Sequence, residues 1–256
     1  FKNRRQIIKA MAGTLLIGSG ISSVFANDKI DWIKLPKANV LTNSLPVTPA
    51  EIVKNYTNYY EFTFNKTDTT SLAQNLPTDP WSVEISGEVE TPGVYHLEDI
   101  LSQQSLKEYI YRFRCVEAWS MVLPWIGFSL ADLLKTVKPL SSARFVQFTS
   151  IYDPKVMPNQ RDNAMLEWPY MEGLRIDEAM HPITTVVTGL YGKALPNQNG
   201  APLRIFVPWK YGFKSAKAIV KIKLVENIYF INSLFNFIYF YSCSILFSKR
   251  IFNFGI

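Results

Sequence analysis

The sequence predicts an α+β domain, mainly β, over residues 27–226 of the 256-residue chain. Three observations favour this fold class. Stretches rich in β-branched and aromatic residues recur along this region, and one of them alternates apolar with polar side chains. Stretches with a helical pattern are fewer and short. No internal repeat or low-complexity linker divides the region, whose length is sufficient for one large hydrophobic core.

The expected elements follow one another along the chain. Residues 28–75 are predicted to form an irregular arm with a short helix inside the segment 45–62. Residues 81–89 alternate apolar and polar side chains, which is typical of a half-buried strand. Short helices are then expected at 96–103 and 129–137, the second with Ser129 as its N-cap. Further strands are predicted at 143–152, 183–192, 202–209 and 216–225.

Residues 1–26 are typical of a twin-arginine signal peptide. The pair Arg4-Arg5 precedes a weakly apolar run that ends in a small-residue cleavage site. Glycines make this run too short and too weak for a good membrane span. We therefore expect the twin-arginine export machinery to deliver the protein to the periplasm. Because the chain begins with Phe1 rather than methionine, we expect the sequence to be incomplete at this end.

Residues 227–256 differ from the body of the chain. Ile, Phe, Tyr, Asn, Leu and Lys dominate this tail, and it has neither helical nor strand periodicity. One interpretation is a membrane anchor that ends at Lys249-Arg250. The favoured interpretation is translation out of frame after a frameshift, because polar residues interrupt the apolar run.

Composition restricts the kinds of chemistry. The net charge of +6 is spread along the chain, which predicts no nucleic-acid partner. Two cysteines, Cys115 and Cys243, and two histidines, His96 and His181, are too few for a disulfide framework or a histidine-rich metal site. No C-x-x-C-H motif for haem, P-loop, G-x-S-x-G elbow or H-E-x-x-H motif occurs. A redox centre must therefore depend on Cys115 or on backbone and basic groups.

Cys115 lies in the stretch YRFRCVEAWSM, residues 111–121. A free cysteine often serves only as a small buried hydrophobe. Here Arg112 and Arg114 precede it and Glu117 follows, so a strand that turned Cys115 inward would bring charge close to the sulfur. Cationic neighbours favour the thiolate, which is both a nucleophile and a metal ligand. A cysteine–histidine hydrolase that pairs Cys115 with His181 stays open on this basis.

Three further stretches are candidates for ligand binding. The segment 55–62, NYTNYYEF, is an aromatic cluster with polar groups. In 191–209 an exposed turn precedes Arg204, which can bind a phosphate or simply begin a strand. In 209–223 a glycine turn with lysines can bind a phosphate without a Walker motif. For the first two stretches alone a purely structural explanation is the more common case, and for the third neither interpretation is favoured.

Together these stretches resemble a known family. Residues 111–134, 171–184 and 191–224 and the YYEF element are similar, in the same order, to catalytic subunits of bacterial periplasmic protein-methionine-sulfoxide reductases, which are molybdoenzymes of the sulfite-oxidase fold. The resemblance covers residues 45–225, and the leader agrees with it. It implies one molybdenum–molybdopterin cofactor per chain, with Cys115 as the metal ligand.

The resemblance also implies the other site residues. Those that contact the cofactor are Asn58, Tyr60, Glu61, Thr149, Asn199, Arg204, Ser215, Ala216 and Lys217, and Thr57 replaces an asparagine that is frequent in the family. Glu117 is the candidate for an outer-sphere or proton-handling catalytic role. The flanking arginines are expected to keep the sulfur ionised.

The implied reaction is the reduction of methionine sulfoxide in oxidised periplasmic proteins, a repair of oxidative damage. Because the chain has no haem motif, electrons are expected from a haem-binding integral membrane subunit that draws on the quinone pool. Family members continue beyond residue 225, so a truncated or frameshifted copy is expected. The alternatives are a sulfite oxidase or another S- or N-oxide reductase on the same fold, and a non-catalytic exported or membrane-anchored binding protein.

Overall fold

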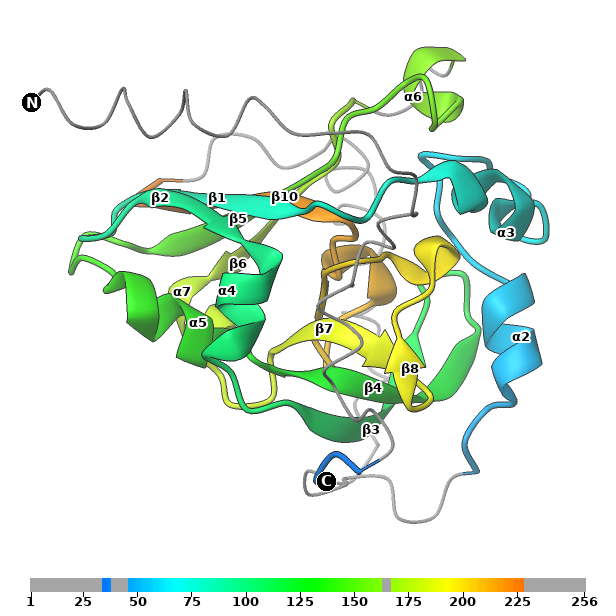
Figure 1. The fold of residues 1–256 in the computed structure, drawn as a ribbon, viewed down its shortest axis with the longest axis horizontal. Helices are drawn as coiled ribbons and strands as arrows, with labels where there is room; N and C mark the ends of the chain where they lie inside the picture. The colour runs from blue at the N-terminus through cyan, green and yellow to red at the C-terminus, as the bar shows by residue number, and fades with distance from the viewer. Residues whose placement is uncertain (1–33, 38–45, 163–166, 228–256) are drawn as a thin grey trace, which may run out of the picture. The chain divides into compact units, whose positions relative to one another are not determined.

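Two five-stranded sheets form the framework of the part of the chain that the structure describes (Figure 1). The computed structural model describes residues 34–37, 46–162 and 167–227. The predicted leader and the tail from residue 228 lie outside the described residues. Among the residues that are described, no helix has the length and apolar character needed to cross a bilayer.

The first sheet is mixed. Its strand order is β2-β1-β10-β5-β6, in which β1 and β10 are parallel and all other neighbours are antiparallel. The bounds are β1 Ser82–Gly87, β2 Gly93–His96, β5 Phe145–Ser150, β6 Met171–Arg175 and β10 Ile219–Val225. Strand β1 confirms the expected alternation, because Trp81, Val83 and Ile85 are buried between less buried polar residues.

The second sheet is antiparallel, with the order β3-β4-β7-β8 and with β9 also paired to β7. Its strands are β3 Lys107–Arg114, β4 Ser120–Ser129, β7 Thr185–Leu190, β8 Lys193–Ala194 and β9 Arg204–Phe206. Strands β3 and β4 form a hairpin whose turn contains Cys115. A hydrophobic core around Tyr111, Trp125 and Phe206 packs against one face of this sheet.

Short helices connect the strands. They are α2 Ala50–Asn55, α3 Thr69–Leu72, α4 Leu97–Ser102, α5 Leu130–Val137, α6 Asn159–Asp162 and α7 Ile176–Ala179, with the 3-10 turns η2 Ala73–Asn75, η3 Asn197–Asn199 and η4 Gly212–Lys214. Helices α4 and α5 lie at one end of the sheets, and α2 and α3 lie at the other end (Figure 1). The structure confirms Ser129 as the N-cap position of α5, although its side chain makes no capping hydrogen bond.

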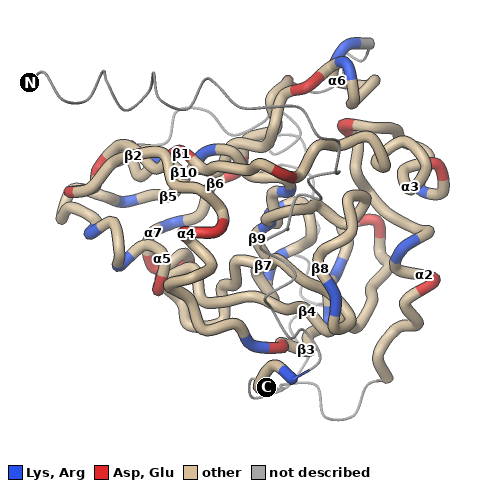
Figure 2. The backbone as a smooth tube through the Cα atoms, viewed as in Figure 1, with Lys and Arg blue, Asp and Glu red and all other residues tan. Residues whose placement is uncertain are grey.

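Basic and acidic residues occur on both sheets and on the connections between them (Figure 2). The electrostatics of any site therefore depend on which few charged side chains the fold brings together.

Candidate functional site

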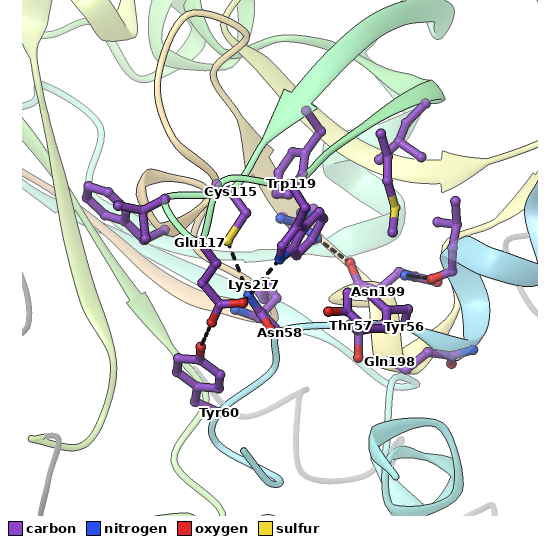
Figure 3. A pocket seen from close by; sticks show the side chains of 18 of the residues that line it. Tyr56, Thr57, Asn58, Tyr60, Cys115, Glu117, Trp119, Gln198, Asn199 and Lys217 are labelled. Atoms are coloured by element: carbon purple, nitrogen blue, oxygen red, sulfur yellow. Dashed lines mark hydrogen bonds between the residues drawn. The ribbon is translucent and has the colours of Figure 1, made fainter. Parts of the chain in front are cut away.

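A cavity of about 280 Å³ lies where four segments of the chain meet beside Trp168 and Tyr170, which also line it (Figure 3). Residues 53–61 supply one wall, and the β3–β4 hairpin supplies a second. The turn around η3 with the start of β9 and the segment 212–217 supply the others. These are the stretches that the sequence singled out, and the fold brings them together around one space.

Cys115 is the first residue of the turn between β3 and β4 rather than part of a strand. Its backbone N–H donates to the carbonyl of Trp119 over 2.9 Å, and its carbonyl accepts from the N–H of Ala118 over 3.2 Å. Ala118 has φ 72°, in the left-handed region that a tight turn needs. This turn places the half-buried Cys115 at the cavity, where Asn58 Nδ2 donates to its Sγ over 3.3 Å.

The prediction that Arg112 and Arg114 keep the sulfur of Cys115 ionised is wrong. Side chains alternate along β3, so the buried Tyr111 and the cavity-lining Phe113 lie on one face of the sheet, and Arg112 and Arg114 lie on the other. Burial raises the pKa of Cys115, and the ionised Glu117 adds to this effect. The groups that oppose it are the backbone N–H of Glu117, Asn58 and Lys66.

Glu117 is the centre of a hydrogen-bond network beside Cys115. Tyr60 donates its hydroxyl proton to Glu117 Oε1 over 2.5 Å, and Trp119 Nε1 donates to Oε2 over 3.1 Å. Lys66 Nζ lies 3.1 Å from the same Oε2. Burial alone would raise the pKa of Glu117, but the hydrogen bonds from Tyr60, Trp119 and Lys66 lower it to about 2. Glu117 therefore carries a fixed negative charge at neutral pH.

Tyr60 stays protonated because of its burial and the same hydrogen bond to Glu117. Burial raises its pKa far above the ordinary value, and the hydrogen bond to Glu117 raises it further. Both members of this pair have a single protonation state over the physiological pH range. The pair ties the segment 56–66 to the Cys115 turn.

Arg204 lies at the other end of the lining. Its guanidinium is buried, with Nη1 donating to Asn199 O over 2.7 Å and Nη2 donating to Ser215 O over 3.3 Å. The Cζ atom lies 5.1 Å from the centroid of Trp125 and 5.6 Å from that of Phe113. Burial lowers the pKa of Arg204 to about 10, which leaves the side chain charged at neutral pH.

Lys217 is the second cation of the cavity. Its Nζ lies 4.6 Å from the ring centroid of Tyr59 and 5.8 Å from that of Tyr170. Burial lowers the pKa of Lys217, and the carboxylate of Glu61 acts in the opposite direction. These aromatic rings hold the ammonium at the cavity without neutralising it.

Several buried polar atoms of these segments have no hydrogen-bond partner among the described residues. Buried polar groups in native proteins are almost always paired, so such a concentration indicates a ligand. The atoms are Thr57 Oγ1, Asn58 Oδ1, Tyr59 OH, Glu61 Oε1, Trp125 Nε1, Asn199 Oδ1, Arg204 Nε and Ser215 Oγ.

Most of the predicted site residues line the cavity: Asn58, Tyr60, Glu61, Cys115, Glu117, Asn199, Arg204 and Lys217. Three do not. Thr149 lies in β5, paired with Lys221 and Met171. Ser215 and Ala216 lie just before Lys217 and use their carbonyls to fix Arg204 and Ile205.

Sequence reasoning missed other residues of the site. Lys66, Trp125 and Tyr170 contact the groups described above. Lys66 lies in a stretch without a local signal, whereas Trp125 lies within the 111–134 stretch of the resemblance but is not among the residues that it implied. Tyr170 immediately precedes the 171–184 stretch of the resemblance. His181 is exposed, packs on Trp209 and does not line the cavity, so the geometry gives no support to a Cys115–His181 hydrolase.

Comparisons with known proteins show the family and the fold of the chain. Residues 70–229 match the family model of the oxidoreductase molybdopterin binding domain. The fold is similar to that of the sulfane dehydrogenase SoxCD from Paracoccus pantotrophus, with a TM-score of 0.51 and 14% sequence identity. The similarity covers 78% of this chain and 58% of that chain, so this chain spans less than two thirds of its length. The predicted fold class, mainly β with a molybdopterin-binding architecture, is thereby confirmed.

Proposed function

Because this chain belongs to the family of oxidoreductases with a molybdopterin-binding domain, we propose that it is the catalytic subunit of an enzyme that reduces methionine sulfoxide in oxidised proteins. The balanced reaction removes one oxygen atom from the sulfoxide, consumes two electrons and two protons, and yields a thioether and water. The sequence resemblance supports this choice of substrate.

The residues of the cavity fit a molybdenum–molybdopterin cofactor. Cys115 offers the soft sulfur donor that suits such a metal. The unpartnered buried atoms include donors and acceptors, as a pterin requires, and Arg204 and Lys217 supply positive charge for a phosphate. Cys115 would hold the metal, and the pterin and phosphate would be held by Asn58, Tyr60, Glu61, Asn199, Arg204 and Lys217. When bound, this cofactor supplies two-electron oxygen-atom transfer.

The observation that carries the choice of substrate is the ionised Glu117 beside Cys115. A fixed carboxylate disfavours an anion such as sulfite at this position, whereas a neutral sulfoxide pays no such penalty. Lys66 compensates the charge of Glu117 but is itself engaged by it.

The walls near Cys115 favour a thioether. Tyr56 and Trp119 pack edge to face with centroids 5.6 Å apart, and Trp168 also lines the cavity. Aromatic rings make favourable contacts with the sulfur and methyl group of methionine. These residues would orient the substrate and exclude water from its apolar part.

Glu117 has a positioning role in this proposal rather than a proton-transfer role. A carboxyl group with a pKa of about 2 carries no proton to donate at neutral pH. Its contacts with Tyr60 and Trp119 instead fix the turn that presents Cys115.

The remaining parts of the proposal rest on the resemblance and on the leader. Export by the twin-arginine machinery would deliver the protein to the periplasm, where its substrates are oxidised periplasmic proteins. A haem-binding integral membrane subunit would supply the electrons.

The experiment uses protein purified from a molybdenum-replete, export-competent host. We expect kcat/KM for a peptide with methionine sulfoxide, measured with a reduced artificial donor, to exceed that for N-oxides. Sulfite should not drive acceptor reduction, and Cys115→Ser should abolish turnover and alter the metal spectrum. Sulfite-dependent acceptor reduction would instead establish a sulfite oxidase. Absence of molybdenum, with membrane retention that depends on residues 228–247, would favour a non-catalytic anchored protein.

A further inference from the structure

A buried ion pair lies behind the segment that brings Lys217 to the cavity. Lys214 Nζ is 2.6 Å from Glu172 Oε2, and these side chains are only 8% and 1% exposed. The same Nζ donates to the carbonyl of Gly173 over 2.5 Å. Glu172 belongs to β6 and Lys214 ends η4, and neither lines the cavity. The pair therefore joins the first sheet to the cavity wall from outside the cavity.

The rest of the segment 212–217 is fixed by other contacts, among them the hydrogen bond from Arg204 Nη2 to the carbonyl of Ser215. Tyr170 donates its hydroxyl to the carbonyl of Phe213 over 2.8 Å. The carbonyl of Ala216 accepts from the N–H of Ile205 over 2.9 Å. Gly212, Phe213 and Lys217 line the cavity, so any shift of this segment changes the wall.

We propose that Glu172 and Lys214 are positioning residues that hold the segment 212–217, and with it Lys217, in the shape that retains the phosphate of the bound pterin. The inference rests on the proposed function and deepens it. A buried ion pair contributes little net stability, because the loss of hydration offsets much of the attraction. What this pair supplies is a fixed distance between β6 and η4, three residues before Lys217, which would hold the phosphate.

The Glu172–Lys214 pair also makes the positioning of η4 depend on pH. Burial raises the pKa of Glu172 to about 7, although Lys214 acts in the opposite direction. The other titratable group that acts on Glu172 is Tyr170, and the residue that faces it from β5 is the apolar Phe148. As the pH rises above 7 Glu172 becomes progressively ionised and the ion pair forms, and as the pH falls below 7 Glu172 becomes progressively neutral. The attachment of η4 to β6 through this ion pair should therefore weaken as the pH falls from 8 to 6.

The experiment compares the purified full chain with Glu172→Gln, Glu172→Asp and Lys214→Met. The matched control is the pair Glu84–Lys221 on the same sheet, which is 2.8 Å long but exposed, tested as Glu84→Gln. One measurement is the rate of molybdopterin release at pH 6 and pH 8, followed by the fluorescence of the oxidised pterin. The second is backbone hydrogen exchange across residues 212–217.

We expect Glu172→Gln and Lys214→Met to accelerate release about tenfold at pH 8, in the range seen for residues that support a metal site from its outer shell. Hydrogen-exchange protection should fall in residues 212–217, and Glu84→Gln should change neither quantity. Because a phosphate itself titrates at about pH 6, the informative quantity is the pH 6 to pH 8 difference, which should be smaller in Glu172→Gln than in the wild type.

A lower melting temperature with wild-type release and wild-type exchange in residues 212–217 would overturn the inference, because the pair would then only stabilise the fold. If Glu172→Gln does not fold, Glu172→Asp decides, since it keeps the charge but shortens its reach. Wild-type release from Glu172→Asp would also overturn the inference. Wild-type protein without molybdopterin would refute the proposed function instead, and exchange in residues 212–217 would still test the positioning.

Discussion

Asn58 Nδ2 lies 3.3 Å from Cys115 Sγ, although 57 residues separate them in the sequence. The contact joins the arm that precedes the first sheet to the hairpin of the second sheet. Asn58 Oδ1 is buried without a partner among the described residues, so this amide supports the sulfur with one end and has an acceptor for a ligand at the other.

We predict that Asn58→Ala weakens metal binding or activity about 10- to 100-fold, which is the usual effect of removing a group that supports a metal ligand. The fold should persist, because Asn58 is only part-buried. Molybdenum content and kcat/KM measure the effect. Asn75→Ala, an exposed asparagine after α3, is the control and should match the wild type. Equal molybdenum content and kcat/KM in both variants would contradict the role of Asn58.

Glu117 is predicted to make stability depend on pH under acidic conditions. Its pKa is about 2 in the folded protein and near 4.5 without these contacts, so the stabilisation is fully present above pH 4.5 and is lost as the pH falls toward 2. Glu117→Gln should lower the free energy of unfolding at pH 7 by about 1 kcal/mol, a modest value for a partly exposed network.

Urea unfolding at pH 7, 4.5 and 3 checks this prediction. The difference between wild type and Glu117→Gln should shrink between pH 4.5 and pH 3. A difference that stays constant over this range would show that Glu117 is not held ionised by its neighbours. Glu51→Gln, at an exposed ion pair with Lys54, is the control.

Strands β1, β5 and β10 of the first sheet could be predicted, and in β1 and β5 buried and less buried residues alternate, whereas β2 and β6 were not predicted. In β1 the alternation of Val83 and Ile85 with polar residues is visible in the sequence. Strand β4 was not predicted, because it is buried on both faces and contains Pro124 and Gly127, whereas β7, also buried on both faces, was predicted from its β-branched residues. A fully buried strand has no alternation, so its apolar run does not distinguish strand from helix.

The candidate site could be predicted in part for a similar reason. Cys115 and Arg204 lie within local stretches whose composition is unusual, and the cavity confirms that these stretches meet. Lys66 could not be predicted, because its importance depends only on where the fold places Glu117. The prediction that Arg112 and Arg114 keep the Cys115 sulfur ionised is wrong, because residues that are close in sequence need not be close in space. Alternation along β3 places both side chains on the face of the sheet away from the sulfur.

Arg204 should not tolerate replacement by lysine. Its two terminal nitrogens bind the carbonyls of Asn199 and Ser215, and a lysine cannot reproduce this planar fork. Arg204→Lys should leave a buried carbonyl unpaired and destabilise the protein by about 2–3 kcal/mol. The free energy of unfolding, measured by chemical denaturation, and the molybdopterin content should both decrease.

Arg175→Lys is the matched control for Arg204→Lys. Arg175 forms an exposed ion pair with Asp177, so its replacement should change the free energy of unfolding by less than about 0.5 kcal/mol. If Arg204→Lys were as mild as Arg175→Lys, the buried fork would not be required.

We predict that the fold requires a glycine at position 212, because the ring of Phe113 lies against it. A Cβ atom at this position would lie 2.4 Å from Cζ and 2.7 Å from Cε1 of Phe113. Phe113 lines the cavity and packs against Trp125 and Phe206, so it cannot move away freely. Gly212→Ala should therefore destabilise the protein by about 1–3 kcal/mol, as overpacking does, and should reduce molybdopterin content.

Two further variants separate the clash with Phe113 from the effect of replacing any glycine by alanine. Gly93→Ala introduces a Cβ whose nearest neighbour is 3.5 Å away, an ordinary contact, and should be nearly neutral. Adding Phe113→Leu to Gly212→Ala removes the ring atoms that clash, so the double variant should be more stable than the sum of the two single effects predicts. Additive effects would mean that the clash with Phe113 is not the reason for a glycine at this position.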